Sequence, residues 1–368
     1  MTTTTPTHSL NRPDRIIMTA GVAAIVLAFV TRSVGGAVLA FLCSALAVTL
    51  LAALVGRSVE QLGDRFGPGA TGALQSALGN LPELFIALFA LKAGLVDVVQ
   101  AALIGSILAN VLLVLGLCFV AGGLKHGTQQ LNSERARSSV VLMVLAVAAL
   151  VLPSLASYVH TPAAQHEKTL SLIVAIVLLV LFALYLPASL RRTPAATTDS
   201  AKTAEKAEPD LTELPRWPLW LALTVLVAAS GAAAFVSDWF VDALQPAMST
   251  LHISPAFAGL VIVAIAGNAV ENVVGIQLAR SGRSEYAFSV VINSPLQIAL
   301  VLAPLLVVLS QVFGLAALTL VFSPMLVVSV VIAVILAAFI TFDGESTWLE
   351  GAAMVAVYCI IAASFWWG

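Results

Sequence analysis

Two glutamates stand out because each lies deep inside a long apolar run. Glu83 ends a Gly-Asn-x-x-Glu motif at residues 79–83, and Glu271 ends a second copy at residues 267–271. A carboxylate at that depth in a bilayer is stable only when it is protonated, paired or bound to a cation. No lysine or arginine lies at comparable depth in the sequence, so protons or external cations must neutralise both groups. The alternative is that each glutamate is a neutral, hydrogen-bonded strut between helices.

Amide and hydroxyl oxygens accompany both glutamates. Each glutamate shares a helix face with the asparagine three residues before it, and the next apolar run adds further polar side chains. These candidate ligands are Asn80, Asn268, Ser106, Asn110, Ser294 and Gln297, with Asn293 expected on the same face as Ser294 and Gln297. Polar side chains also join membrane helices through hydrogen bonds, which is the alternative for each of them.

The backbone near the first motif is expected to be irregular. Pro82 has no N–H group and cannot donate to the Leu78 carbonyl, so this oxygen is freed and the helix breaks or kinks. Gly79 and Gly267 allow another backbone to approach closely. Ordinary packing and kinking are the alternative, because glycine and proline are frequent in membrane helices.

This set of donors favours hard cations. Ca²⁺ takes six to eight oxygen ligands, whereas Mg²⁺ usually keeps several of its waters. Two carboxylates neutralise one divalent ion. Burial raises the pKa of carboxyl groups in general, so protons are expected to compete for the same site. The three cysteines lie in apolar runs and the five histidines lie in loops or near helix ends, which argues against zinc and against a histidine relay.

The composition restricts the class of protein. Of the 368 residues, 60% are hydrophobic and 10% are charged, whereas about a quarter of a soluble domain is charged. The net charge of −2 shows no basic surplus for nucleic acid. An intramembrane enzyme is disfavoured because the sequence has no His-Glu-x-x-His motif and no Gly-x-Ser-x-Gly motif. A passive cation channel remains an alternative.

The chain divides into apolar runs of the length that crosses a bilayer, roughly 20 residues. Eleven such runs are expected at about 16–31, 34–55, 70–92, 98–121, 138–158, 169–189, 217–236, 255–279, 286–310, 316–340 and 349–366. The predicted fold class is an all-α integral membrane protein with eleven transmembrane helices. Residues 190–216 contain proline and balanced charges and are expected to form a flexible cytoplasmic linker.

Basic residues indicate the orientation, because they are retained on the cytoplasmic side during insertion. With the N-terminus inside, only Arg32, Lys92 and Lys168 of the 17 Lys and Arg residues fall outside. With eleven spans, the C-terminus then lies outside, on the side opposite to the N-terminus. The first run follows basic residues but precedes no small-residue cleavage site, so we expect a retained helix rather than a signal peptide.

The two Gly-Asn-x-x-Glu motifs lie five runs apart. Because five is odd, the second copy enters the membrane from the opposite side, which is typical of an inverted-topology repeat with a site between its halves. The expected divisions are a tail and first helix at 1–33, five-helix halves at 34–189 and 217–368, and the linker between them.

The motif regions also resemble a known family. GNLPELFIALFALKAGL and VVQAALIGSILANVLLVLG, within the stretch from Gly63 to Gly116, closely resemble the first conserved repeat of the calcium/proton exchanger family (CAX) of the calcium/cation antiporter superfamily. GNAVENVVGIQLA and SVVINSPLQIALVLAP are similar to the second repeat. The resemblance implies export of cytoplasmic Ca²⁺ in exchange for H⁺, with Glu83 and Glu271 alternating between the two ions. It also implies a peripheral first helix followed by the two inverted halves.

The remaining expectations follow from this resemblance. Ca²⁺, protons and the lipid bilayer are the expected partners, a homo-oligomer is compatible with the sequence, and neither a resident cofactor nor an enzymatic activity is expected. The expected location is the plasma membrane of a bacterium. A Na⁺/Ca²⁺ exchanger of the same superfamily is the alternative. The chain departs from the family pattern at residues 75–78 and 293–297 and at Asn272, where many members carry histidine; these positions bear on ion selectivity.

Overall fold

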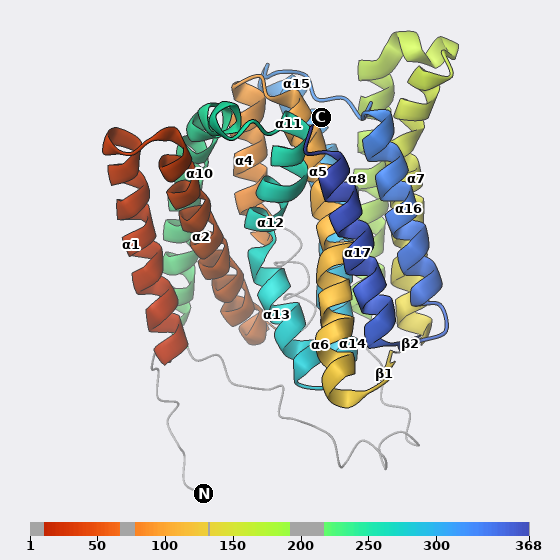
Figure 1. The fold of residues 1–368 in the computed structure, drawn as a ribbon, viewed down its shortest axis with the longest axis horizontal. Helices are drawn as coiled ribbons and strands as arrows, with labels where there is room; N and C mark the ends of the chain where they lie inside the picture. Colours follow the sequence, from red (N-terminus) through yellow and green to blue (C-terminus); the bar gives the residue numbers. More distant parts are fainter. Residues whose placement is uncertain (1–10, 67–77, 132, 192–216, 368) are drawn as a thin grey trace, which may run out of the picture.

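The computed structural model describes residues 11–66, 78–131, 133–191 and 217–367, which form a bundle of helices (Figure 1). The helices are α1 (Arg12–Val34), α2 (Ala37–Phe66), α4 (Leu81–Lys92), α5 (Val96–Leu108), α6 (Leu115–His126), α7 (Ser133–Tyr158), α8 (Glu167–Arg191), α10 (Leu219–Leu251), α11 (Pro255–Phe257), α12 (Ala264–Gly267), α13 (Ala269–Arg280), α14 (Ser284–Gln297), α15 (Ala303–Val312), α16 (Pro324–Ile340) and α17 (Trp348–Ser364). The π-helical turns η1 (Ala109–Val114), η3 (Ala258–Val263) and η4 (Ile298–Leu302) connect neighbouring helices, and η2 (Pro162–His166) is a short 3₁₀ helix.

Many of these helices suit a membrane. Seven helical segments of the described residues are long and apolar enough to cross a bilayer, or eight if the bent pair Pro255–Gly267 and Asn272–Arg280 is one span. The apolar helices α16 and α17 are shorter, with 17 residues each. Large apolar side chains face outward, including Val227 (72% exposed) and Phe339 (76% exposed). Such a surface is stable in lipid rather than in water, so the chain is a multi-pass integral membrane protein.

The bundle has two groups of helices. In Figure 1, α1, α2 and α10 lie together at the left, and the other helices gather beside them. The two long helices α2 and α10 pack along each other, and Phe41 stacks on Phe240 with ring centroids 5.1 Å apart. Helix α1 packs mainly against α2 at the edge of the bundle, the peripheral position that the resemblance implied.

The seventh predicted run ends too early. Helix α10 does not stop at residue 236 but continues to Leu251, so that it has 33 residues. Asp238 and Asp242, beyond the end of the predicted run, are therefore helical, and Asp242 pairs with Arg32 at 3.0 Å on the exposed surface. Thirty-three residues rise about 50 Å, well beyond a hydrocarbon core of about 30 Å, so the helix can carry charges outside the apolar layer.

The tenth predicted run begins too early. Helix α16 begins at Pro324 rather than at residue 316, and the preceding segment 315–323 is not helical. Side chains of neighbouring helices replace the missing helical hydrogen bonds: Ser154 Oγ accepts from Phe322 N at 2.9 Å, and Gln100 Nε2 donates to the carbonyls of Thr319 and Val321 at 2.9 and 3.0 Å. An apolar, non-helical segment is stable here because its buried backbone groups are paired.

The prediction of an all-α fold needs one small correction. Strands β1 (Gln129–Gln130) and β2 (Glu345–Ser346) form a two-residue antiparallel ladder between two connecting loops. Loops that meet at the same end of a bundle satisfy their backbone groups by pairing with each other. At this end the Lys125 Nζ also donates to Arg280 O at 3.0 Å, so that the ends of α6 and α13 lie together.

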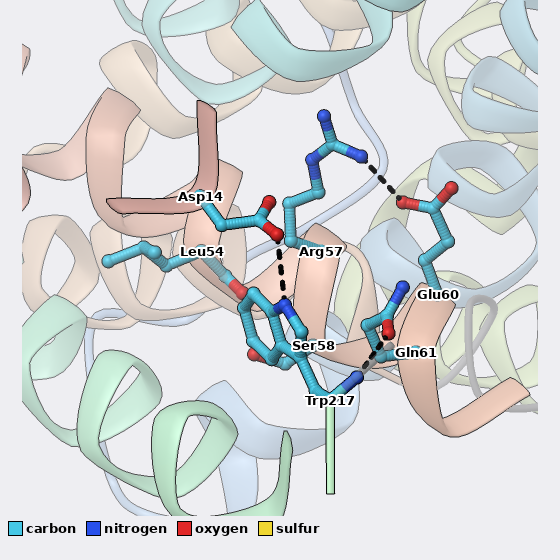
Figure 2. Close-up of polar contacts among 7 residues, drawn as sticks. All are labelled: Asp14, Leu54, Arg57, Ser58, Glu60, Gln61 and Trp217. Atoms are coloured by element: carbon cyan, nitrogen blue, oxygen red, sulfur yellow. Dashed lines mark hydrogen bonds and ion pairs between the residues drawn. The ribbon is translucent and has the colours of Figure 1, made fainter. Parts of the chain in front are cut away.

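Trp217 anchors the start of α10 to α1 and α2 (Figure 2). Its indole Nε1 donates to Asp14 Oδ2 at 3.0 Å, and its backbone N–H donates to Gln61 Oε1 at 3.0 Å. Trp217 is 2% exposed and Asp14 is 8% exposed. These two hydrogen bonds hold three helices together at one end of the bundle.

We expect Trp217→Phe to destabilise the protein, because it leaves the buried Asp14 carboxyl without its indole donor. The loss of a hydrogen bond to such a group corresponds to about 1.5–3 kcal/mol. Thermal denaturation of the purified protein in detergent should show a clearly lower Tm. Trp220→Phe is the matched control, because Trp220 is 67% exposed in the first turn of α10, three residues after Trp217. Equal Tm values for the two variants would contradict the anchoring role.

Candidate functional site

Both Gly-Asn-x-x-Glu motifs lie at breaks in the helical backbone. Asn80 has φ −97° and ψ 20°, and Asn268 has φ −95° and ψ 17°. Each asparagine directly precedes a helix of 12 residues, α4 after Asn80 and α13 after Asn268. From its break, α4 lies in the upper part of the bundle in Figure 1 and α13 lies in the lower part. The same local geometry therefore occurs twice, and each copy begins a helix that leaves its break toward the opposite end of the bundle.

Glu83 connects the two motifs in space. Its side chain is buried, with 8% of its surface exposed, and it lies in the first turn of α4. A Cβ atom on Gly267 would lie 2.8 Å from Glu83 Cγ and 3.0 Å from Glu83 Oε1. The carboxyl group thus occupies the space that the missing side chain of Gly267 leaves. The side chain of Glu271 lies outside the described residues, although its backbone belongs to the first turn of α13.

Asn268 is the centre of a buried polar network. Its Nδ2 donates to Ser106 Oγ at 3.0 Å and to Ala264 O at 2.9 Å, while its Oδ1 accepts from Asn110 Nδ2 at 2.9 Å and from Ser294 Oγ at 3.0 Å. Asn268 and Asn110 are 0% exposed. The structure therefore brings together four of the predicted ligands, which come from α5, η1, α14 and the break before α13.

The network pairs every hydrogen-bonding group of the Asn268 side chain but leaves the side-chain oxygen of Asn110 without a partner among the described residues. Asn110 Nδ2 donates to Ser106 O at 2.9 Å in addition to Asn268, while Asn110 Oδ1 is buried and has no hydrogen-bond partner among the described residues. In this structure the Asn268 side chain joins helices through hydrogen bonds, which was the alternative to cation binding for each of the polar candidates. The Asn110 amide oxygen keeps its capacity to accept a donor or a cation.

Other candidates are less enclosed. Leu78, Gly79, Asn80 and Gln297 are half-buried, and the described residues provide no hydrogen bond to the Asn80 side chain. Asn293 does not join the network, because its side chain is exposed while Ser294, the next residue, is buried in it. Consecutive helical residues point about 100° apart, so only one of the two can face the Asn268 amide.

A cavity lies beside Glu83. Together with its open mouth it comprises about 420 Å³ of space, and Glu83 and Ser106 are the polar residues in its lining. The other lining residues are apolar: Ile86, Ala87, Ala90, Val98, Val99, Ala102, Leu103, Leu244, Val263 and Leu302. On α4 and α5 the lining continues turn by turn from the site toward the end of the bundle at which α4 ends and α5 begins. The cavity therefore extends from the buried carboxyl group toward one face of the protein.

Thr49 of α2 is a further residue beside the site, and no motif in the sequence indicates it. Its Oγ1 donates to the carbonyl of Ala266 at 3.2 Å, beside the break at Asn268. The second run contains two hydroxyl residues, Ser44 and Thr49, and nothing in the sequence distinguishes Thr49 from a helical residue that bonds to its own helix.

The network supports a test that separates a structural role from ligand binding. Asn268→Ala removes four hydrogen bonds and leaves buried partners unsatisfied, so we expect a loss of about 2–4 kcal/mol in stability even without ions. Asn80→Ala, at the matching break, should change ion-free stability by less than about 1 kcal/mol. Thermal denaturation in detergent with a chelator measures both. Similar Tm losses in the two variants would contradict the role of Asn268.

Fold and site together define a membrane protein with a cluster of amides, hydroxyls and a carboxyl group buried among broken apolar helices. The model of the sodium/calcium exchanger protein family matches residues 36–191 and 221–367. The chain belongs to this family.

Relatives match over nearly the whole length. The chain is 35% identical over 357 residues to the Ca(2+)/H(+) antiporter ChaA of Bacillus subtilis, which covers 97% of this chain and 99% of the relative. It is 34% identical over 339 residues to the Ca(2+)/H(+) antiporter of Aphanothece halophytica, covering 88% and 89%. The structure of native YfkE superposes with a TM-score of 0.79 at 32% identity over 95% of this chain and 99% of YfkE. The H+/Ca2+ exchanger CAX, at 18% identity and a TM-score of 0.74 over 96% and 92%, shares the fold.

Proposed function

We propose that this protein is a secondary transporter that exchanges Ca²⁺ for H⁺ across the membrane. The observation that carries the proposal is the position of Glu83: a buried carboxyl group against Gly267, beside a cavity and a network of amide and hydroxyl oxygens. The relatives named Ca(2+)/H(+) antiporter, at 34% and 35% identity over most of the chain, support the choice of ions.

The chemistry follows from the two forms of the Glu83 carboxyl group, which lies in the first turn of α4. The group can therefore hold a proton or, after releasing it, contribute a carboxylate to Ca²⁺. Glu271, Asn80, Asn268, Ser106, Asn110, Ser294 and Gln297, with the backbone at Leu78, Gly79 and Gly267, complete the proposed oxygen set. Because both ions need the same oxygens, binding of one expels the other.

Coupling requires that the site open to only one face at a time. We propose that the halves 34–189 and 217–368 are inverted repeats in an eleven-helix plan, which supports rocking of one half against the other around a central site. The paired breaks at Asn80 and Asn268, with α4 and α13 in opposite parts of the bundle, support this arrangement. The sorting of basic residues supports a cytoplasmic N-terminus and linker and an external C-terminus. The cavity beside Glu83 would then be the path to the external face.

Gradient-driven flux tests the proposal. Purified protein in proteoliposomes should take up ⁴⁵Ca²⁺ when a proton gradient is imposed, and addition of a protonophore should stop uptake. Protein-free liposomes under the same gradient are the control. Uptake that follows a sodium gradient and ignores the proton gradient would instead identify a Na⁺/Ca²⁺ exchanger. Discrete single-channel currents would contradict a carrier.

A further inference from the structure

Two hydroxyl residues occupy corresponding positions in the two long helices. The paired motif residues are separated by one interval of 188 positions (267 − 79 and 271 − 83), and the same interval separates Ser106 from Ser294 (294 − 106). Applied to Thr49 of α2, it leads to Ser237 of α10 (237 − 49). The acceptor of Thr49 is Ala266 O, and its counterpart in the first half is the carbonyl of Leu78 (266 − 188).

The two hydroxyl groups are in different situations. Thr49 Oγ1 donates across the helix interface to Ala266 O at 3.2 Å, in the last turn of α12, where carbonyls lack partners from their own helix. Ser237 is 0% exposed, and its Oγ has no hydrogen-bond partner among the described residues. Other helical hydroxyls, such as those of Ser44 and Ser58 in α2, donate to the carbonyl four residues earlier in their own helix. An unpaired buried hydroxyl is unfavourable, so Ser237 is suited to a hydrogen-bond acceptor that comes within reach only in another conformation.

The two breaks also differ in burial and hydrogen bonding, as the two hydroxyl groups do. At the second break Asn268 is completely buried and uses all its hydrogen-bonding groups, with Thr49 holding the adjacent carbonyl. At the first break Asn80 is half-buried, and the cavity lies next to Glu83. Among the described residues, the second break is thus fully packed into the bundle, whereas the first is half-buried beside the cavity. In an inverted repeat, exchange of these two arrangements produces the opposite-facing state.

We infer that Thr49 and Ser237 are paired positioning residues for alternating access. In the state described here Thr49 holds the Ala266 carbonyl; in the opposite state Ser237 Oγ donates to the Leu78 carbonyl and Thr49 releases its acceptor. Helix α10 packs along α4, which places Ser237 on the helix that must move relative to the first break. This inference rests on the proposed function, because it assigns the residues that stabilise the two states of the carrier.

Accessibility of the cavity measures the balance between the states. A single cysteine at Ala102, a half-buried residue of the cavity wall, is introduced after replacing Cys43, Cys118 and Cys359 by alanine. The rate of its modification by a small methanethiosulfonate reagent is measured on the detergent-purified, ion-free protein. Thr49→Val should shift the balance away from the open cavity by about threefold to tenfold, the effect of one hydrogen bond, and slow the modification.

The second substitution should act in the opposite direction. Ser237→Ala removes the hydroxyl that stabilises the other state, so adding it to Thr49→Val should restore faster modification. Thr49→Ser keeps the hydroxyl and should behave as the parent. Ser230→Ala is the matched control. The Ser230 hydroxyl of α10 is also buried without a partner among the described residues, but its counterpart in α2 is Leu42, which has no hydroxyl (230 − 188).

The outcomes separate this inference from the proposed function. Unchanged modification in Thr49→Val, or a double variant as slow as Thr49→Val alone, overturns the pairing of the two hydroxyls. A loss of stability alone would change the modification rate of both single variants in the same direction. That result would also overturn the pairing. The assay uses no ion gradient, so a parent protein that fails to exchange Ca²⁺ for H⁺ contradicts the proposed function without deciding this test.

Discussion

Glu83→Gln is expected to abolish proton-driven Ca²⁺ uptake, with a rate at least about a hundredfold below that of the parent. The glutamine side chain has nearly the same size and fits the space against Gly267, but it can neither release a proton nor offer a negative charge to Ca²⁺. Removing one charged partner from a buried site typically costs about 2–5 kcal/mol or more. A loss within this range lowers the affinity for Ca²⁺ about a hundredfold.

The variant should nevertheless be well folded, because a neutral amide is less costly in an apolar bundle than a carboxylate. Its Tm in ion-free detergent should equal or exceed that of the parent, and addition of Ca²⁺ should no longer raise it. Glu345→Gln is the matched control: Glu345 is exposed in β2, and the amide oxygen of glutamine can still accept from Gln130 Nε2. Uptake by Glu83→Gln at half the parental rate would exclude Glu83 from the exchange.

Gly105→Ala is expected to disrupt the contact between α5 and η3, the packing on which the site depends. A Cβ atom on Gly105 would lie 2.3 Å from Leu260 O and 2.4 Å from Leu260 Cα. The contact is reciprocal, because a Cβ atom on Gly259 in η3 would lie 2.3 Å from Val98 O in α5. Both clashes involve backbone atoms, so no side-chain rotation relieves them and the two helices must separate.

The expected loss of stability is about 3 kcal/mol or more, at or beyond the upper end of overpacking effects. Ser106 is adjacent to Gly105, so separation of the helices also pulls its hydroxyl from Asn268 and should reduce transport. The yield of monodisperse protein, its Tm and its Ca²⁺ uptake measure these effects. Gly231→Ala is the matched control, because a Cβ atom there meets nothing within 4 Å in the helix α10; it should be neutral or slightly stabilising. A normal Tm for Gly105→Ala would contradict the close packing.

The amino-acid sequence alone identified the two motif glutamates, the membrane class and most of the helices. Each of these follows from a local property: a carboxylate such as that of Glu83 is unfavourable in hydrocarbon unless it is protonated, paired or bound to a cation, and a run of about 20 apolar residues predicts a span by its length. The family resemblance is also local, because each motif that supports it is a contiguous stretch of sequence. These inferences require no knowledge of which helices touch.

The tertiary structure decided which polar residues meet. Asn293 and Ser294 are adjacent and equally polar in sequence, but only Ser294 faces the Asn268 amide. Segment 315–323 is as apolar as a helix, yet it is not helical, and serine and glutamine side chains of other helices pair its backbone. Gly105 resembles any other membrane glycine until Leu260 is placed against it. In each case the free energy depends on a partner distant in sequence, so only the packed bundle determines the outcome.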